Sequence, residues 1–335
     1  MAVNISSQMN SSTINHFACY DPSIFIQAPA SLHANYIVAA VFNAVFSFTA
    51  FFGNVLILFA LKKTSSINSA SNSLLCNLAL SDLLVGLLVQ PLHVIYCIYG
   101  FIGGPEVRCY VRIMFQWTSD YFIALSFMTI VAISLDRYLT LCQHHAYRSA
   151  MTPCRIREVI AVLWISCLSF PLGRLVSSSI PMILSSVVFL IFLVIPSYAV
   201  YKIYRFLKQH EIQISSQFSN PFAKNSNMVG FNVLQYKRSV STLLCVYFAL
   251  LVCFLPSVAV TVAWVTADQS GKLRLIQVGN FSLTFIMFNS TLNPFLYCWR
   301  IREVRKLTKS LLKKLFSCAN KTNDNDNKYS EDTRL

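Results

Sequence analysis

Charged residues and glycine are both scarce in this chain of 335 residues. Asp, Glu, Lys and Arg together make up 12% of it, whereas soluble globular domains carry about 25%. Only 9 residues are glycine, and no glycine-rich loop of the kind that cradles phosphate groups is present. Hydrophobic residues reach 55%, and the mean hydropathy is +0.55. This balance excludes an ordinary soluble globule and indicates that most of the chain folds in lipid.

Long apolar segments fill the space that charged residues leave. Five segments are each long enough to cross a bilayer as a helix, which takes about 20 residues. Three of them carry no charge, and two carry one acid each, Asp82 or Asp120. A further run over 159–201 is about twice that length, and Pro171 and Pro181 interrupt it, which predicts two helices joined by a short loop. The sequence therefore predicts an all-α bundle of seven transmembrane helices. The five single segments are 36–61, 73–101, 113–134, 239–267 and 275–299.

Basic residues are distributed unevenly among the loops between these segments. When the loops are assigned alternately to the two sides of the membrane, few of the 27 Lys and Arg residues fall on the side of the N-terminus. Because cytoplasmic loops carry an excess of Lys and Arg, we predict a multi-pass plasma-membrane protein whose N-terminus lies outside. The basic residues that give the chain its net charge of +14 then lie mostly at the inner membrane surface, and no nucleic-acid binding is expected. The basic residues on the outer side are Arg108, Arg112, Arg174, Lys272 and Arg274.

The pattern predicts one membrane domain between two tails. We expect an extracellular tail over 1–33 and a membrane domain over 34–299. A basic amphipathic pattern over 300–318 predicts a short eighth helix on the inner leaflet, followed by a disordered cytoplasmic tail over 319–335. A flexible inner loop is expected over 210–233, where Ser, Asn, Gln and Gly cluster.

Three positions in these tails are candidates for modification. Asn4 and Asn10 stand in Asn-X-Ser sequences and are predicted glycosylation sites, although such short matches also arise by chance. Cys318 follows the amphipathic pattern and is a candidate for palmitoylation, with a plain free thiol as the alternative.

Seven short motifs, one in each predicted helix, occur in a fixed order along the membrane domain. They are Gly53-Asn54, the run from Leu78 to Leu84, Asp136-Arg137-Tyr138, Trp164, Pro196 with Tyr204, the run from Cys253 to Pro256, and the run from Asn293 to Tyr297. In order and register this set resembles the rhodopsin-like (class A) family of G-protein-coupled receptors. The resemblance covers about 34–316.

The resemblance implies a receptor that binds an extracellular ligand and activates heterotrimeric G proteins when helix six moves outward. It implies that Asp136 holds Arg137 at rest and releases it on activation. Pro196 and Pro256 remove backbone hydrogen bonds from helices five and six and predict hinges there. Arrestin and membrane lipids are the further implied partners. The predicted switch residues are Asp136, Arg137, Tyr138, Tyr204, Phe254, Pro256, Asn293, Pro294 and Tyr297.

Asp82 lies in the middle of an apolar segment, where an ionisable side chain is costly and is by default functional. The resemblance implies that Asp82 faces Ser126, Asn289 and Asn293. Their oxygens suit a sodium ion bound as an allosteric ligand in the resting receptor, and a hydrated network without an ion is the alternative. No other metal and no cofactor is expected.

Two positions in helix six depart from the family pattern. Tyr236 stands where an acid often locks the arginine at rest. Since that resting contact is missing, we expect elevated basal signalling, by a few-fold for a contact of about 1 kcal/mol. Phe254 stands where a tryptophan usually precedes Pro256, so an aromatic side chain is retained there.

The cysteines depart from the pattern as well. Arg112 stands where helix three usually supplies the cysteine of a disulfide to the second outer loop, and Cys109 lies one turn further out. Because the outer side is oxidising, Cys109 is a candidate for pairing with Cys19 or Cys97, with free thiols as the alternative.

The ligand is the least constrained part of the prediction. Ser119 stands where amine receptors carry an aspartate, although Asp120 is adjacent, and Met287 stands where retinal-binding receptors carry a lysine. Light sensing is therefore not expected, and we predict a small peptide or a small molecule as the ligand. The predicted pocket residues are Gln116, Ser119, Asp120, Ile123, Ser257, Thr261, Trp264, Leu283 and Met287.

Three other classes of protein fit the sequence less well. An enzyme is not expected, because no nucleophile, base and orienting group occur together. A transporter would have paired internal repeats, which the two halves of the chain lack. A receptor-like scavenger without signalling remains as the nearest alternative, although the intact Asp136-Arg137-Tyr138 argues against it.

Overall fold

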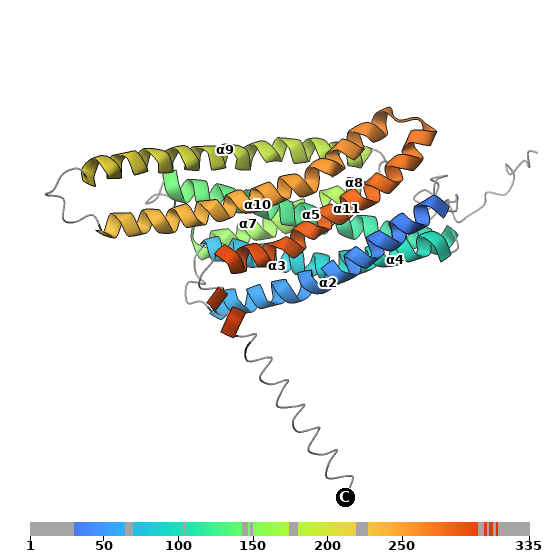
Figure 1. Ribbon diagram of the computed structural model, residues 1–335, viewed down its shortest axis with the longest axis horizontal. Helices are drawn as coiled ribbons and strands as arrows, with labels where there is room; N and C mark the ends of the chain where they lie inside the picture. The colour runs from blue at the N-terminus through green and yellow to red at the C-terminus, as the bar shows by residue number, and fades with distance from the viewer. Residues whose placement is uncertain are drawn as a thin grey trace, which may run out of the picture.

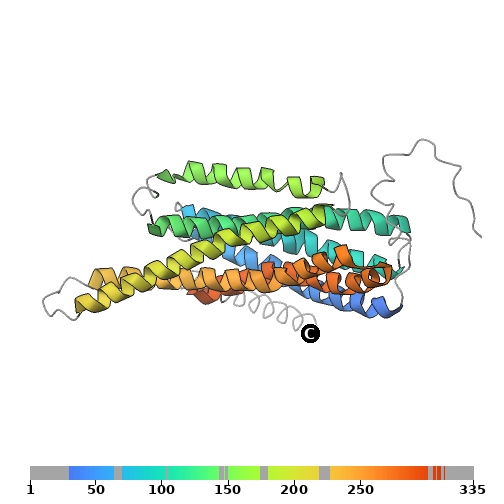
Figure 2. The same cartoon turned by 90° about the horizontal axis from the view of Figure 1, so that it is seen from above.

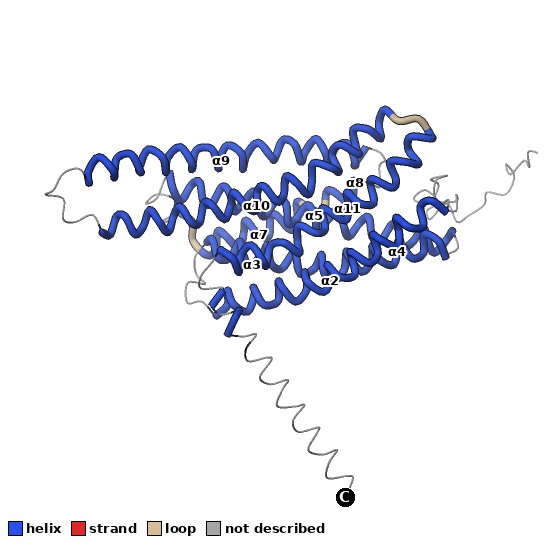
Figure 3. Tube along the Cα trace, viewed as in Figure 1, coloured by secondary structure: helices blue, strands red, loops and turns tan. Residues whose placement is uncertain are grey.

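The computed structural model describes residues 30–63, 70–102, 105–142, 147, 150–173, 180–218, 227–300, 305–306, 308–310 and 313. All of these form helices or the short connections between them, and no strand occurs among them (Figure 3). The predicted sites Asn4, Asn10, Cys19 and Cys318 lie outside the described residues, as do residues 1–29 of the predicted outer tail and the whole inner tail.

Seven helical rods run side by side along the long axis of the molecule (Figure 1). The first is α2 (Ala30–Lys63), and the third is α5 (Pro105–Cys142). The second consists of α3 (Ala70–Leu84), η1 (Val85–Val89) and α4 (Gln90–Ile102), and the fourth of α7 (Pro153–Ser166) and α8 (Ser169–Gly173). The last three rods are α9 (Ile180–Phe218), α10 (Asn227–Thr266) and α11 (Gln269–Arg300).

Most rods close into a ring in which α2, α3, α5, α9, α10 and α11 each contact the next, and α11 contacts α2. The fourth rod lies outside this ring: α7 contacts α3 and α5 and is seen at one edge of the molecule (Figure 2). We call the half of the bundle that contains the first turns of α2 and α5 the outer half, and the opposite half the inner half.

Six of the rods are long and apolar enough to cross a membrane. The seventh, α11, is the exception among the described helices, because it carries many amides and hydroxyls, including Asn280, Asn289 and Asn293. These side chains are buried in the bundle, while large apolar side chains such as Phe48, Phe59 and Phe248 are exposed on its surface. The helices therefore turn polar groups inward and apolar groups toward lipid, as a membrane bundle requires.

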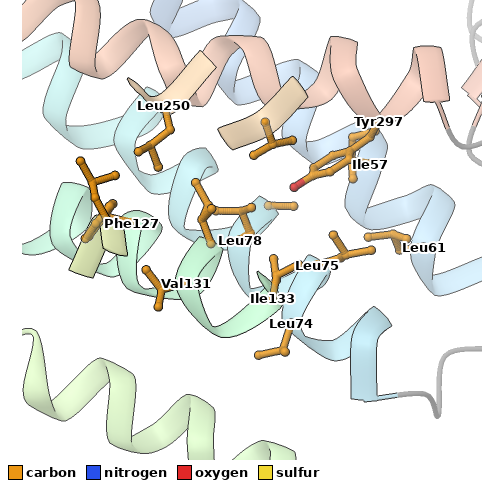
Figure 4. Close-up of a cluster of buried hydrophobic side chains, with 14 of the residues drawn as sticks. Ile57, Leu61, Leu74, Leu75, Leu78, Phe127, Val131, Ile133, Leu250 and Tyr297 are labelled. Atoms are coloured by element: carbon orange, nitrogen blue, oxygen red, sulfur yellow. The ribbon is translucent and has the colours of Figure 1, made fainter. Parts of the chain in front are cut away.

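One apolar cluster joins the helices around the middle of the bundle. It contains Ile57 of α2, Leu78 of α3, Phe127 of α5, Leu250 of α10 and Tyr297 of α11, whose side chains gather in Figure 4.

A π-helical turn, η1, changes the direction in which the side chains of the second rod point around its axis. At η1 the chain adds a residue to the turn, and Gly86 packs so closely on α2 that a Cβ there would lie 2.8 Å from the Phe51 nitrogen. The Ser47 hydroxyl donates to the Gly86 carbonyl at 2.7 Å.

One of the sequence predictions changes in this structure. The inner loop expected over 210–233 is shorter, because α9 continues to Phe218 and α10 begins at Asn227, so both helices project beyond the others (Figure 1). Polar residues do not end a helix whose backbone hydrogen bonds are satisfied within it. The predicted eighth helix lies mostly outside the described residues.

Candidate functional site

A cavity of about 410 Å³ lies in the outer half, between α5, α9, α10 and α11. Its wall is mainly apolar and aromatic, with a few polar groups, as in small-molecule sites generally. All predicted pocket residues line it except Met287. They are Gln116, Ser119, Asp120, Ile123, Ser257, Thr261, Trp264 and Leu283.

The prediction for Met287 was wrong. Its side chain is only 1% exposed and packs with Val85, Val89 and Phe115 on the side of the second rod. Its neighbour Ile286 lines the cavity instead. Successive residues on an α-helix are rotated by about 100° about its axis. An error of one residue in the register is therefore enough to turn a side chain from the cavity toward the second rod.

Three phenylalanine rings in mutual contact form one wall of the cavity. Phe254 of α10 stacks on Phe189 of α9 with ring centroids 4.6 Å apart and an interplanar angle of 9°. Phe127 of α5 lies 4.7 Å from Phe189 and 5.8 Å from Phe254 between ring centroids. Phe254 stands two residues before Pro256 and is one of the predicted switch residues. Its side chain lines the cavity. Phe189 was missed because a phenylalanine in an apolar run carries no distinguishing sequence signal.

Arg112 and Tyr36 also line the cavity, although neither was predicted to do so. Arg112 lies four residues before Gln116 and eight before Asp120 on α5, and all three side chains reach the cavity. The helical spacing of the predicted residues alone would have included Arg112 on the same face.

Asp82 is fully buried at the centre of the bundle, with 0% exposure. The Ser126 hydroxyl donates to Asp82 Oδ1 at 2.6 Å, and Asn293 Nδ2 donates to Asp82 Oδ2 at 2.5 Å. The Ser126 hydroxyl also lies 3.0 Å from that of Ser81. Asn289 is buried nearby on α11, and its Oδ1 and that of Asn293 have no hydrogen-bond partner. Asp82 therefore connects helices two, three and seven through direct side-chain bonds.

The inner end of α5 carries the Asp136-Arg137-Tyr138 motif. Asp136 is 3% exposed, and its Oδ1 accepts a hydrogen bond of 3.0 Å from the hydroxyl of Tyr147. Burial, and then the negative charge of Asp136, raise the pKa of Tyr147 above its ordinary value. The Tyr138 ring meets the Tyr198 ring of α9 edge to face, with centroids 6.1 Å apart. Tyr147 was missed because the loop that carries it has no periodic pattern to place its side chain.

Two tyrosines among the predicted switch residues, Tyr204 and Tyr297, occupy different environments. Tyr297 is 3% exposed and belongs to the central apolar cluster, whereas Tyr204 is 57% exposed on the surface of α9. Pro294 packs against α2, where a Cβ on Gly53 would lie 2.9 Å from Pro294 Cγ. In this conformation Tyr204 does not join the buried switch residues.

A hydroxyl cluster joins α9 to α10 directly after Pro196. The hydroxyls of Ser197 and Tyr247 form a short hydrogen bond with each other. The Ser197 hydroxyl donates to the Leu193 carbonyl at 2.6 Å, so the single proton of Tyr247 is available for the Ser197 oxygen. The Tyr247 oxygen also lies 3.3 Å from the Leu193 carbonyl oxygen. The side chain of Tyr236, on the inner part of α10, is not among those described.

Cys109 is disulfide-bonded and 2% exposed at the outer end of α5. Cys97 is a free, buried thiol, so its suggested pairing with Cys109 was wrong. Its sulfur instead lies 3.9 Å from His93 Nε2, which in turn is 2.8 Å from Asn280 Oδ1.

Comparison with known proteins assigns the whole arrangement to one family. Residues 53–180 and 168–297 match the family described as "7 transmembrane receptor (rhodopsin family)". The human protein named "Probable G-protein coupled receptor 63" is 23% identical over 304 residues, 80% of this chain and 71% of its own length. The "High-affinity lysophosphatidic acid receptor" of Xenopus laevis is 24% identical over 306 residues, 80% of each chain.

A third relative is more similar over a shorter stretch. The human "Adenosine receptor A2b" is 33% identical over 125 residues, which cover 36% of this chain and 34% of the receptor. The family match spans more than half of the chain and contains the buried Asp82, the Asp136-Arg137-Tyr138 motif and the motif from Asn293 to Tyr297. The chain belongs to the rhodopsin family of seven-transmembrane receptors and is a G-protein-coupled receptor.

Proposed function

We propose that a small peptide or small molecule enters the cavity from outside the cell and activates heterotrimeric G proteins by moving α10 outward. The observation that carries this proposal is the position of Phe254. It lines the cavity and stacks on Phe189, and it belongs to the helix that Pro256 interrupts. A ligand that displaces this ring acts directly on the segment of α10 where the backbone lacks a hydrogen bond.

A coupling screen tests the signalling part of this proposal. Cells expressing the receptor are compared across G-protein subtypes with cells expressing Arg137→Ala and with mock-transfected cells, at matched surface expression. We expect a basal signal above mock for at least one subtype, because the usual acid of helix six is replaced at Tyr236, and loss of that signal in Arg137→Ala. Equal signals from the two receptors would contradict the proposal and favour a non-signalling scavenger.

The names of the relatives leave the ligand class open. They describe receptors for lysophosphatidic acid, for adenosine and, in the "Alpha-2B adrenergic receptor" of several mammals, for an adrenergic ligand. The proposal of a small ligand therefore rests on the size and mixed polarity of the cavity rather than on any one relative.

We further propose that Asp82 and its neighbours hold a sodium ion in the resting receptor. The residues fit such an ion, because the buried Asn289 Oδ1 and Asn293 Oδ1 lack hydrogen-bond partners and the Asp82 carboxylate retains lone pairs beyond those it uses. Oxygen ligands of this kind suit hard cations. Sodium would be expected to lower basal signalling of the wild-type receptor but not of Asp82→Asn.

The orientation and the modifications are proposed from the sequence. We propose a plasma-membrane receptor with Asn4 and Asn10 glycosylated outside, Cys318 palmitoylated inside, and arrestin as a second cytoplasmic partner. Cys109 is disulfide-bonded and Cys97 is a free thiol, which supports Cys19 of the outer tail as the partner of Cys109. Mass spectrometry of non-reduced peptides would test this pairing, and a peptide with unmodified Cys19 would contradict it.

A further inference from the structure

One exposed face of α9 changes its chemistry along the helix. At the middle of the bundle this face is apolar, and its exposed side chains are those of Val187, Leu190, Ile191 and Val194. Toward the inner end the same face carries tyrosines and then cations, at steps of one, three or four residues that keep them on one side of the helix. These residues, which we call the α9 stripe, are Tyr198, Tyr201, Lys202, Arg205 and Lys208, and all five are exposed.

The α9 stripe lies opposite the face of α9 that packs into the bundle. Ala199 and Ile203 form that packed face and are 1% and 0% exposed. The stripe therefore points toward the membrane and not into the bundle. At its edge the Tyr198 ring meets the ring of Tyr138, with centroids 6.1 Å apart, so the stripe borders the motif at the inner end of α5.

Two cations of the stripe are held in place by its tyrosine rings. The Lys202 ammonium lies 5.5 Å from the centroid of the Tyr198 ring, and the Arg205 guanidinium carbon lies 5.9 Å from that of Tyr201. Arg205 Nη1 also donates to the Tyr201 hydroxyl at 3.4 Å. A ring occupies only one side of an ammonium or a guanidinium group, and each has several N–H donors. Both cations are thus positioned and keep donors for an anion.

The positive charge of the stripe has no acid beside it on its own helix. From Ile180 to Gln209, α9 contains no Asp or Glu, and Glu211 is its only acid. Lys202, Arg205 and Lys208 place three positive charges within two turns. An anion with several negative charges fits this surface better than an anion with one.

We infer that the α9 stripe binds the headgroup of a phosphoinositide, an inositol phospholipid with two phosphates on its ring. Its acyl chains would lie along the apolar part of the same face, so one molecule matches the order of apolar, tyrosine and basic side chains along α9. Each ring phosphate carries about 1.5 to 2 negative charges at pH 7, whereas phosphatidylserine carries a single net charge. The inference rests on the proposed orientation, which places the inner half at the cytoplasmic leaflet.

Native mass spectrometry of the full-length receptor in detergent tests this binding. The receptor is titrated with dioctanoyl phosphatidylinositol 4,5-bisphosphate, with dioctanoyl phosphatidylserine and with inositol trisphosphate, which has the phosphorylated ring but no acyl chains. We expect the phosphoinositide to bind more tightly than either of the other two, because only it offers both the charge and the chains.

Receptor variants show whether the stripe is the site. Replacing both Lys202→Gln and Arg205→Gln should weaken phosphoinositide binding about thirtyfold, since each basic residue near an anionic headgroup contributes about 1 kcal/mol and each 1.4 kcal/mol is tenfold. Arg157→Gln is the matched control. Arg157 is an exposed cation of α7 in the inner half and lies outside the stripe, so its replacement should leave the affinity unchanged.

A second pair of variants tests the role of the rings. Tyr201→Leu keeps every charge but removes the ring that positions Arg205, and it should weaken binding two- to fivefold. Tyr201→Phe keeps the ring and should stay close to the wild type. Equal melting temperatures in the same detergent establish that each variant is folded.

Several results would overturn the inference. They are equal affinities for the phosphoinositide and phosphatidylserine, an equal loss of binding in Arg157→Gln and in the double variant, or a double variant that binds the lipid normally but no longer binds purified G protein, which would make the stripe a protein surface. An N-terminal epitope that antibodies reach only in permeabilised cells would also overturn it, because the stripe would then lie in the outer leaflet. The lipid titration measures no signalling, so its failure leaves the proposed coupling intact, and a failed coupling screen leaves the lipid site standing.

Discussion

The α2–α11 side and the α9–α10 side of the bundle are held together by different kinds of contact. Between α2 and α11, directional hydrogen bonds occur at four levels from the outer half to the inner half. They run from Asn35 to the Gln277 carbonyl at 3.1 Å, from Asn43 to the Thr284 hydroxyl at 3.0 Å, from Asn54 to the Ser290 carbonyl at 3.2 Å and from Thr291 to the Phe46 carbonyl at 3.3 Å. We call this set of hydrogen bonds the seam. Because of it, α2 and α11 cannot slide past each other without breaking several bonds together.

Between α9 and α10, rings replace most of these bonds. Among the side chains that the structure describes there, Phe189 stacks on Phe254 and the hydroxyls of Ser197 and Tyr247 form one polar cluster. Both helices also contain an internal proline, Pro196 in α9 and Pro256 in α10. Stacked rings can shift with little directional cost, which suits the proposed outward movement of α10. We therefore call the α2–α11 side the fixed side and the α9–α10 side the movable side.

The largest expected effect comes from wedging the fixed side apart. A Cβ on Gly86 would lie 2.8 Å from the Phe51 nitrogen and 2.9 Å from Ala50 Cβ, and backbone cannot move aside as a side chain can. We expect Gly86→Val to destabilise the receptor by more than about 3 kcal/mol, above the usual range for overpacking. Surface expression and thermal unfolding in detergent measure this loss.

Gly279→Ala is the control for that substitution. A Cβ at Gly279 would meet Val260 Cγ1 at 3.6 Å, an ordinary contact, so the melting temperature should not fall. Normal expression and melting of Gly86→Val would show that the second rod is not seated on α2 as described.

The movable side predicts a gain of signalling rather than a loss of stability. Tyr247→Phe removes one hydroxyl and keeps the ring, so it deletes the bond to Ser197 and the longer contact with the Leu193 carbonyl. If this cluster holds α10 at rest, removing a hydrogen bond that contributes about 1 kcal/mol shifts the equilibrium between the resting and active forms roughly fivefold toward the active form. Basal second-messenger production at matched surface expression measures the shift.

A double-variant cycle separates this explanation from a general loosening. Ser197→Ala removes the partner hydroxyl, and its effect should not add to that of Tyr247→Phe because both act on the same bond. Additive increases, or a basal signal that falls to the mock level in Tyr247→Phe, would mean that the cluster does not restrain α10.

Part of the fold and of the site was predicted from the sequence, and the rest was missed for physical reasons. The apolar segments predicted the seven helices, and the family resemblance implied that Asp82 faces Ser126 and Asn293, which hydrogen-bond to it in the structure. Met287 was misassigned because one residue of register turns a side chain by about 100°. The pairing of Tyr247 with Ser197 joins two helices at positions without any motif. Only the packing of the bundle determines that these side chains meet.

A smaller effect is expected from a single bond of the seam. Asn43 and Thr284 are buried on facing helices, and Asn43 Nδ2 donates to the Thr284 hydroxyl. We expect Asn43→Leu to cost about 1 kcal/mol in thermal stability, since side-chain hydrogen bonds inside membrane bundles contribute about 0.6–1.7 kcal/mol. Basal signalling should not rise, because the other bonds of the seam remain.

Adding Thr284→Val to Asn43→Leu should change the stability little further. The Thr284 hydroxyl also donates to the Asn280 carbonyl at 3.0 Å, so it keeps a partner when Asn43 is replaced, and both substitutions delete the same bond between α2 and α11. A basal signal in Asn43→Leu as high as that in Tyr247→Phe would erase the distinction between the fixed and the movable side.

The smallest expected effect tests whether the hydroxyl restraint extends to the inner end of α5. Tyr147→Phe deletes the bond to Asp136, which should free the motif slightly and raise basal signalling by no more than about threefold, since the site is only partly buried.

The raised pKa of Tyr147 means that the phenol keeps its proton in the folded receptor above pH 10, its ordinary value. Its contribution to stability is therefore fully present below pH 10 and is lost as the pH rises beyond that value. The difference in melting temperature between the wild type and Tyr147→Phe should stay constant from pH 6 to 9 and decrease above pH 10. A difference that already changes between pH 6 and 8 would show that another group, and not this phenol, titrates with the restraint.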